Sequence, residues 1–133
     1  MPLPWSGDAA PFAFSTPEGA EAEPWLPTQP ELWRELTVEA QSGDPDSMLE
    51  LYRSALTLRR AEPGFGSERE SLRWLESTES VLAFRRGDEA ACVVNLSAAP
   101  VELPAHSAVL LTSSPLTDDG LLPPDCAAWL RVG

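Results

Sequence analysis

Carboxylates are the most numerous groups in this sequence that could do chemistry. The chain has 21 Asp and Glu residues among 133, and general acid–base catalysis needs two or more of them facing one substrate. With so many acids some pair is close in any fold, so each candidate is weighed against a local role. Asp44 and Asp46 stand where an N-cap and a negative charge favour the start of a helix. Asp118 and Asp119 precede a glycine without the further alternating oxygen ligands of a calcium loop, which indicates a turn.

The histidine and the two cysteines give no further candidate for a catalytic or metal site. His106 is the only histidine, and no spacing places a nucleophile and an orienting acid beside it. Cys92 and Cys126 each lie in an apolar stretch, where we expect reduced, buried thiols; a disulfide requires adjacent strands. The sequence contains no CxxC, GxSxG, P-loop or GxGxxG motif. We therefore predict no catalytic residue, no metal site and no cofactor within this chain.

Aromatic residues alternate with prolines near the start of the chain, in PLPW, PFAF and PWLP. Their rings could stack on pyranose faces, or they could anchor the segment onto a larger body; we favour the anchor because free tails rarely contain so much aromatic surface. The residues concerned are Trp5, Phe12, Phe14, Trp25 and Trp33. Trp74, Phe84 and Trp129 lie in expected strands, and we predict them to be core.

The charge balance excludes some partners. The formal net charge is -12, and all nine basic residues are arginine. Such a chain repels phosphate backbones and anionic bilayers, so we expect neither nucleic acid nor membrane as a partner. Its apolar runs are far shorter than the roughly 18 residues of a membrane span, and no signal-peptide pattern opens the sequence. We expect a cytoplasmic, bacterial protein.

The elements that would position these residues change along the chain. A helix is predicted over Pro45–Ala61, with Asp44 as N-cap and an apolar stripe at helical spacing; the stripe consists of Met48, Leu51, Tyr52, Ala55 and Leu56. After Gly66 short Val- and Leu-rich segments alternate with turn residues, which is typical of strands. They lie near Leu72–Leu75, Val81–Arg85, Ala91–Leu96, Val101–Leu103, Ala108–Leu111 and Ala127–Val132, with a hairpin turn at Arg86–Glu89. The fold class is mainly β with one long α-helix, the strands forming a small antiparallel Greek-key sandwich.

Several short motifs together resemble a known family. They occur in this order: PLPW (Pro2–Trp5), AFS (Ala13–Ser15), PWLP (Pro24–Pro27), TVEAQ (Thr37–Gln41), DPDSMLELYR (Asp44–Arg53), VLAFRR (Val81–Arg86), VVNLS (Val93–Ser97) and LPA (Leu103–Ala105). The run resembles the region after the eighth barrel strand in the α-glucosidase and oligo-1,6-glucosidase branch of the α-amylase superfamily, glycoside hydrolase family 13. Each motif is weak alone, but the first five stand at the gaps that the family shows.

The resemblance implies three regions. Residues 1–43 would be a Pro- and Trp-rich loop from the barrel mouth, mobile or loosely packed; residues 44–66 the last barrel helix; and residues 67–133 the C-terminal antiparallel β-sandwich. Because the rest of the barrel is missing, we expect the helix to lie on the sandwich.

The resemblance also implies a function. The family's catalytic carboxylates follow the fourth, fifth and seventh barrel strands, before the position of Met1, so we expect a non-catalytic C-terminal fragment of a retaining α-glucosidase-like enzyme. Trp5 and Trp25 would belong to a loop near the substrate. The implied partners are the missing barrel portion and α-linked glucosides. A stand-alone carbohydrate-binding or interaction module, and a complementing subunit of a split glucosidase, remain alternatives, and hydrolysis against transglycosylation or isomerisation stays open.

Overall fold

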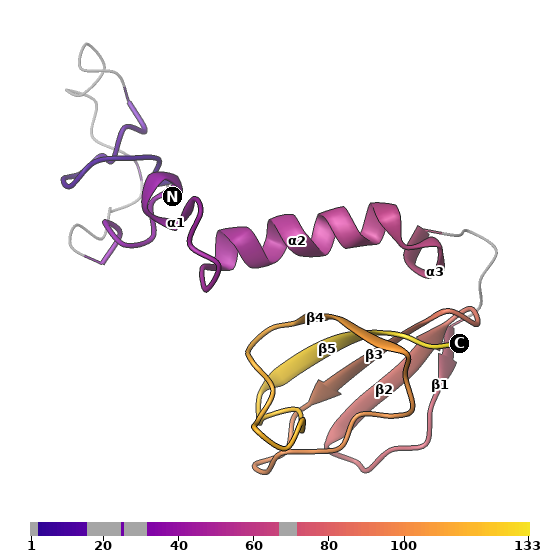
Figure 1. The fold of residues 1–133 in the computed structure, drawn as a ribbon. Helices are drawn as coiled ribbons and strands as arrows, with labels where there is room; N and C mark the ends of the chain where they lie inside the picture. Colours follow the sequence, from indigo (N-terminus) through magenta and orange to yellow (C-terminus); the bar gives the residue numbers. More distant parts are fainter. Residues whose placement is uncertain (1–2, 16–24, 26–31, 67–71) are drawn as a thin grey trace. The chain divides into compact units, whose positions relative to one another are not determined.

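The computed structural model describes residues 3–15, 25, 32–66 and 72–133. They fall into two compact units, Met1–Arg53 and Ser54–Gly133, and the boundary lies within a helix. The helices are α1 (Val38–Gln41), α2 (Met48–Ala61) and α3 (Pro63–Gly66). The strands are β1 (Leu72–Trp74), β2 (Val81–Arg86), β3 (Ala90–Asn95), β4 (Ala108–Thr112) and β5 (Cys126–Arg131) (Figure 1).

The first unit has a small core of its own. Phe12 and Trp33 are buried, and their ring centroids lie 6.4 Å apart. Thr37 is also buried and is the N-cap of α1, where its hydroxyl accepts the N–H of Ala40 at 3.1 Å and donates to the carbonyl of Arg34. Phe12 and Trp33 thus pack on each other within this unit, and the expected anchoring of the aromatic segment onto a larger body stays a prediction.

Helix α2 begins later than predicted. Asp44 does not cap it, because its carboxylate accepts the N–H of Asp46 in a turn before the helix. Ser47 takes the capping role instead, with its hydroxyl accepting the N–H of Glu50 at 3.2 Å. The predicted end at Ala61 is confirmed, and Arg59 and Arg60 lie in the last turn, where they complement the helix dipole.

The strands form one antiparallel sheet in the order β1-β2-β3-β5-β4. Five of the six predicted segments are strands in the structure. The hairpin expected at Arg86–Glu89 joins β2 to β3, and Gly87 adopts φ +58° there, a conformation that glycine takes without steric cost. Because β3 and β4 lie on either side of β5, the chain between them crosses over the sheet.

The expected second sheet of the sandwich is not present among the described residues. The sixth predicted segment, Val101–Leu103, contributes one bridge, in which the backbones of Val101 and Leu122 exchange hydrogen bonds of 3.0 and 2.8 Å. The physical reason lies in the prolines of the two connections that contain this bridge, since a proline has no N–H for a ladder. These prolines are Pro100, Pro104, Pro115, Pro123 and Pro124.

The core lies between the sheet and this single-bridge layer. Leu122 is fully buried in the layer, and Val101, Leu103 and Leu116 pack against the core that contains it. Strand β3 is buried on both faces. The side chains of the sheet that join this core come from alternate positions along β3 and β5 and from one position of β2. They are Ala83, Ala91, Val93, Cys126, Ala128 and Leu130.

Asn95 joins the layer to the sheet. Its side chain is fully buried, and its amide nitrogen donates to the carbonyls of Ala99, Leu122 and Pro123 at 2.9, 3.0 and 2.9 Å. Its amide oxygen accepts the N–H and the hydroxyl of Ser97 at 2.9 and 2.7 Å. One polar side chain thus satisfies the carbonyls of Ala99 and Pro123, which have no ladder partner, and adds a second hydrogen bond to the carbonyl of Leu122.

The opposite, outer face of the sheet is partly covered by α3. The ring of Phe65 packs on Trp129 with centroids 4.7 Å apart, and a Cβ added at Gly64 would lie 2.7 Å from the Cβ of Ala90. Beside this contact Glu62 and Arg131 form an ion pair. No residue of α2 is buried, and the expectation that this helix lies on the sandwich stays a prediction.

Candidate functional site

Trp5 lies in a loop whose backbone is fixed on both sides. Its N–H donates to the carbonyl of Phe12 at 2.8 Å, and its carbonyl accepts the N–H of Glu39 in α1 at 2.9 Å. The Glu39 carboxylate also accepts the N–H of Gly7 at 3.0 Å. Despite this anchored backbone, 49% of Trp5 is exposed. The loop therefore presents a half-exposed indole ring from an anchored backbone.

Two further residues show that the loop is held against local preference. Phe12 and Ala13 have φ values of +53° and +55°, a region that residues with a side chain seldom adopt. The burial of Phe12 against Trp33 explains how this conformation persists. Phe14, two residues further on, is exposed like Trp5. The loop thus buries one aromatic residue to display two others.

Trp25 differs from Trp5. It is 99% exposed, and the residues on either side of it lie outside the described part of the chain. The structure does not bring Trp25 together with Trp5. Of the two tryptophans predicted near the substrate, only Trp5 has a defined setting.

Of the apolar stripe predicted on α2, Leu51 and Ala55 are half-buried, and the described residues leave the other three members largely uncovered. Met48, Tyr52 and Leu56 are 61%, 64% and 49% exposed. They stand four residues apart, on one side of the helix. A stripe of this kind is typical of a helix that packs on another element.

A second uncovered apolar area lies on the outer face of the sheet, along β1 and β2. Trp74 and Phe84 are cross-strand partners whose rings meet edge to face at 5.7 Å. Leu72 and Leu82 lie on the same face and are exposed. The prediction that Trp74 is core is wrong, because 67% of it is exposed. The sequence position of Trp74 does not show which part of a sheet face is covered. In the structure α3 contacts this face at β3 and β5.

The acids and the histidine considered as catalytic candidates lie in local turns or contacts. His106 Nδ1 lies 2.8 Å from the carbonyl of Pro104. Asp118 and Asp119 lie in a turn that the N–H of Gly120 closes on the carbonyl of Thr117 at 2.8 Å. Among the described residues no three His, Cys, Asp or Glu side chains could hold a metal ion.

Among the described residues, three groups have shifted pKa values. The backbone N–H of Gly43, followed by Arg53, lowers the pKa of Glu50. Glu62 raises the pKa of Arg131 through a hydrogen bond and charge. Burial raises the pKa of the Cys92 thiol, which makes it a poor nucleophile. All three shifts have structural causes, and none indicates a catalytic pair.

The two cysteines are free and buried, as expected. In the register of β3 with β5, Cys126 lies opposite Asn95, and Cys92 lies opposite Trp129. Since Cys92 and Asn95 are three residues apart on β3, the two thiols point to opposite faces of the sheet. The register therefore keeps them from forming a disulfide.

Comparison with known proteins connects these features to a family. Residues 69–129 match the family described as a domain of unknown function, DUF3459. A probable α-glucosidase of Rhizobium meliloti (strain 1021) is 37% identical over 98 residues, which cover 68% of this chain and 17% of that protein. An α-amylase from H. orenii has a similar fold, with a TM-score of 0.59 and 19% identity, over the whole of this chain and 28% of the amylase.

The chain therefore contains a C-terminal DUF3459 domain of the α-glucosidase and α-amylase family, as the motifs indicated. The amylase contributes evidence on the fold alone, which is a mainly β arrangement with short helices matching part of that enzyme. The chain spans about a sixth of the α-glucosidase relative (17%). In the described part of the chain, no helix is both long and apolar enough to cross a bilayer.

Proposed function

We propose that this chain is the C-terminal part of an α-glucosidase-like glycoside hydrolase, and that it does not cleave glycosides by itself. In this proposal α2 is the last helix of a catalytic barrel, and the sheet with its single-bridge layer is a reduced Greek-key sandwich. Trp5 belongs to a loop at the barrel mouth, where active sites of such barrels lie. The chain contributes packing and one displayed aromatic ring, and another part of the enzyme contributes the carboxylates.

The uncovered stripe of α2 is the observation that carries this proposal. A large apolar side chain contributes about 1.5–3 kcal/mol when it is fully buried. Because Met48, Tyr52 and Leu56 are about half to two thirds exposed, roughly 3 kcal/mol is not realised in this chain. Neighbouring elements of a barrel would bury these side chains, and the chain would then gain this free energy. The outer face at Trp74 offers a second apolar surface for the same catalytic portion.

A chimera tests the proposal. The matching C-terminal region of the Rhizobium meliloti relative is replaced by this chain, and turnover of p-nitrophenyl α-glucoside is measured for the chimera and for the 133-residue chain alone. We expect turnover by the chimera and none by the chain. Saturable turnover by the chain alone would show that its own acids are catalytic, and a soluble but inactive chimera would reject the proposed role.

Two matched variants of the chimera test the stripe. Leu56→Glu places a charge on the apolar side of α2, and Ser54→Glu places the same charge on its opposite side. We expect Leu56→Glu to lower the yield of active chimera at least several-fold and Ser54→Glu to leave it unchanged. Equal effects of the two substitutions would mean that the stripe is not a packing surface.

A second candidate function rests on the anchored Trp5 and the exposed Trp74. Exposed rings held by a rigid backbone suit stacking on pyranose faces, so the chain alone could be a carbohydrate-binding module. Titration with maltoheptaose, followed by the indole N–H signals in NMR spectra, tests this. Saturable shifts that disappear in Trp5→Ala or Trp74→Ala would favour it, and unchanged spectra would reject it.

A further inference from the structure

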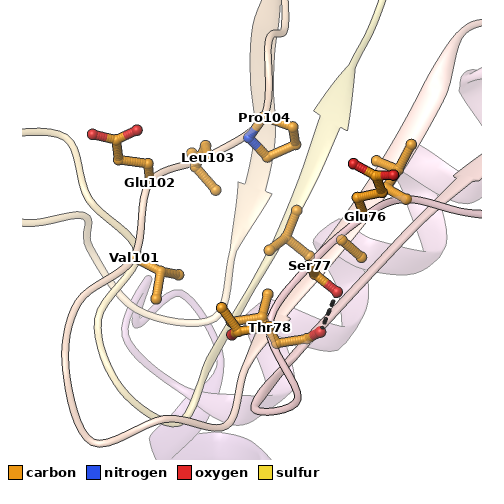
Figure 2. A pocket seen from close by; sticks show the side chains of 11 residues that line it. Glu76, Ser77, Thr78, Val101, Glu102, Leu103 and Pro104 are labelled. Atoms are coloured by element: carbon orange, nitrogen blue, oxygen red, sulfur yellow. Dashed lines mark hydrogen bonds between the residues drawn. The ribbon is translucent and has the colours of Figure 1, made fainter.

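A pocket opens at one end of the core, on the side of the sheet opposite Trp74. Its volume is about 320 Å³, which is near the lower end of the range for small-molecule sites. The run Glu76–Thr78 lies on one side of the opening and the run Val101–Pro104 on the other (Figure 2). The pocket exists because the layer over the sheet has one bridge only and leaves this end of the core without a cover.

The floor of the pocket is apolar. It consists of side chains from the sheet and from the layer: Leu75, Val81, Ala83, Val93, Val101 and Leu103. No aromatic ring lines it, so a pyranose has no surface on which to stack. A short aliphatic chain fits such a floor, since its transfer from water is favourable along its whole length.

The rim is polar and accepts hydrogen bonds. Glu76 and Glu102 are exposed at opposite sides of the opening. Neither carboxylate has an ion-pair partner in the part of the chain that the structure describes, and no basic side chain lines the pocket. The hydroxyl of Ser77 donates to the carbonyl of Val81 at 2.7 Å, so its proton is not directed at a ligand. The rim therefore selects a group that is positively charged and donates hydrogen bonds.

We infer that this pocket binds a small aliphatic ammonium ion, with the chain on the apolar floor and the ammonium group between Glu76 and Glu102. The chemical class follows from charge complementarity at the rim and from the absence of aromatic residues in the lining. This site is independent of the glycosidase role, because it lies in the second unit and needs no catalytic portion.

Three ligands with the same six-carbon chain test the inference on the intact 133-residue protein. They are n-hexylammonium, 1-hexanol and n-hexanoate, titrated at neutral pH and followed by amide shifts in NMR spectra. An exposed ion pair contributes up to about 1 kcal/mol, or about five-fold in affinity. With two carboxylates at the rim, we expect hexylammonium to bind roughly ten-fold more tightly than hexanol, and hexanoate to bind most weakly. The saturable shifts should lie at residues 75–78 and 101–104.

Variants at the rim complete the test. The double substitution Glu76→Gln, Glu102→Gln should abolish the preference for the ammonium while hexanol binding stays unchanged. Glu79→Gln, which removes a nearby exposed charge that does not line the pocket, should change nothing. Equal binding of the three ligands, shifts confined to the Trp74 face or to α2, a preference that survives the double substitution, or no saturable shift with any ligand would each overturn the inference.

Discussion

Asn95→Ala should be among the most destabilising single substitutions in the second unit. Four hydrogens take part in the hydrogen bonds of this side chain. The amide donates two, which three carbonyls share, and the amide oxygen accepts two from Ser97. At a net value of about 1 kcal/mol for each hydrogen bond, the upper limit is about 4 kcal/mol. Two effects lower it. The carbonyl of Leu122 keeps the N–H of Val101, and Ser97 can reach water. We expect a loss of about 3 kcal/mol.

That loss is large for a unit of this size. Residues 54–133 number 80, and at about 0.05–0.15 kcal/mol per residue their total stability is roughly 4–12 kcal/mol. With a urea dependence of about 1 kcal/mol per molar, the midpoint should fall by about 3 M. The assay is a urea titration followed by the amide signals of β3 and β5, which report this unit alone.

Two companion variants separate the hydrogen bonds from the lost volume. Asn95→Asp keeps the size of the side chain but turns an acceptor toward three carbonyl oxygens, so it should be at least as destabilising as Asn95→Ala at neutral pH. Ser97→Ala removes one of the two donors to Asn95 and should cost about 1 kcal/mol. If Asn95→Asp stays within about 1 kcal/mol of the natural protein, the network does not hold the layer to the sheet and the reasoning is refuted.

Three other substitutions or conditions test separate parts of the structure. Gly64→Ala should lower stability by about 1–3 kcal/mol because the new methyl group meets Ala90 at 2.7 Å. Thermal melts should show a partial recovery when Ala90→Gly is added. If Gly64→Ala leaves the melting temperature unchanged, α3 does not contact β3 this closely. Cys92 has a raised pKa, so the unfolded chain loses this thiol proton first and stability should fall as pH rises above the ordinary thiol pKa. In urea titrations at alkaline pH, Cys92→Ala should remove this part of the dependence of stability on pH. An unchanged dependence would contradict the prediction. Glu50 has a lowered pKa, so its stabilisation of the start of α2 should be complete above the ordinary carboxyl pKa and be lost as pH falls through the lowered pKa. The amide shifts of the first turn of α2 should follow this titration. If Glu50→Gln shows the same titration, the prediction is refuted.

The strands were predictable because their signals are local. Short apolar runs separated by glycine, proline and acidic turns marked five strands within about one residue of their bounds. The start of α2 was harder, since both Asp44 and Ser47 are good capping residues. The choice between them depends on which backbone N–H each side chain reaches, and the turn at Asp44–Asp46 decides it. Helix α1 was missed because four residues are too few for a periodic pattern.

The family and its region of the enzyme were predictable as well, from several weak motifs in a fixed order. The candidate site was predictable only in part. The sequence nominated Trp5 and Trp25 equally, yet only the backbone hydrogen bonds between Trp5 and both Phe12 and Glu39 show that one of these residues lies in an anchored loop. Trp74 was assigned to the core because a strand position does not tell which face of a sheet is covered.

Local chemistry along the chain was thus sufficient for the five strands and the end of α2, because proline, glycine and acidic turn residues act on their neighbours and short apolar runs identify strands. The strand order, the Asn95 network, the pocket between Glu76 and Glu102 and the exposure of Trp74 were decided only by tertiary structure. Each joins residues that lie far apart in the sequence or depends on what covers a face, and burial of a side chain is a property of its surroundings in space.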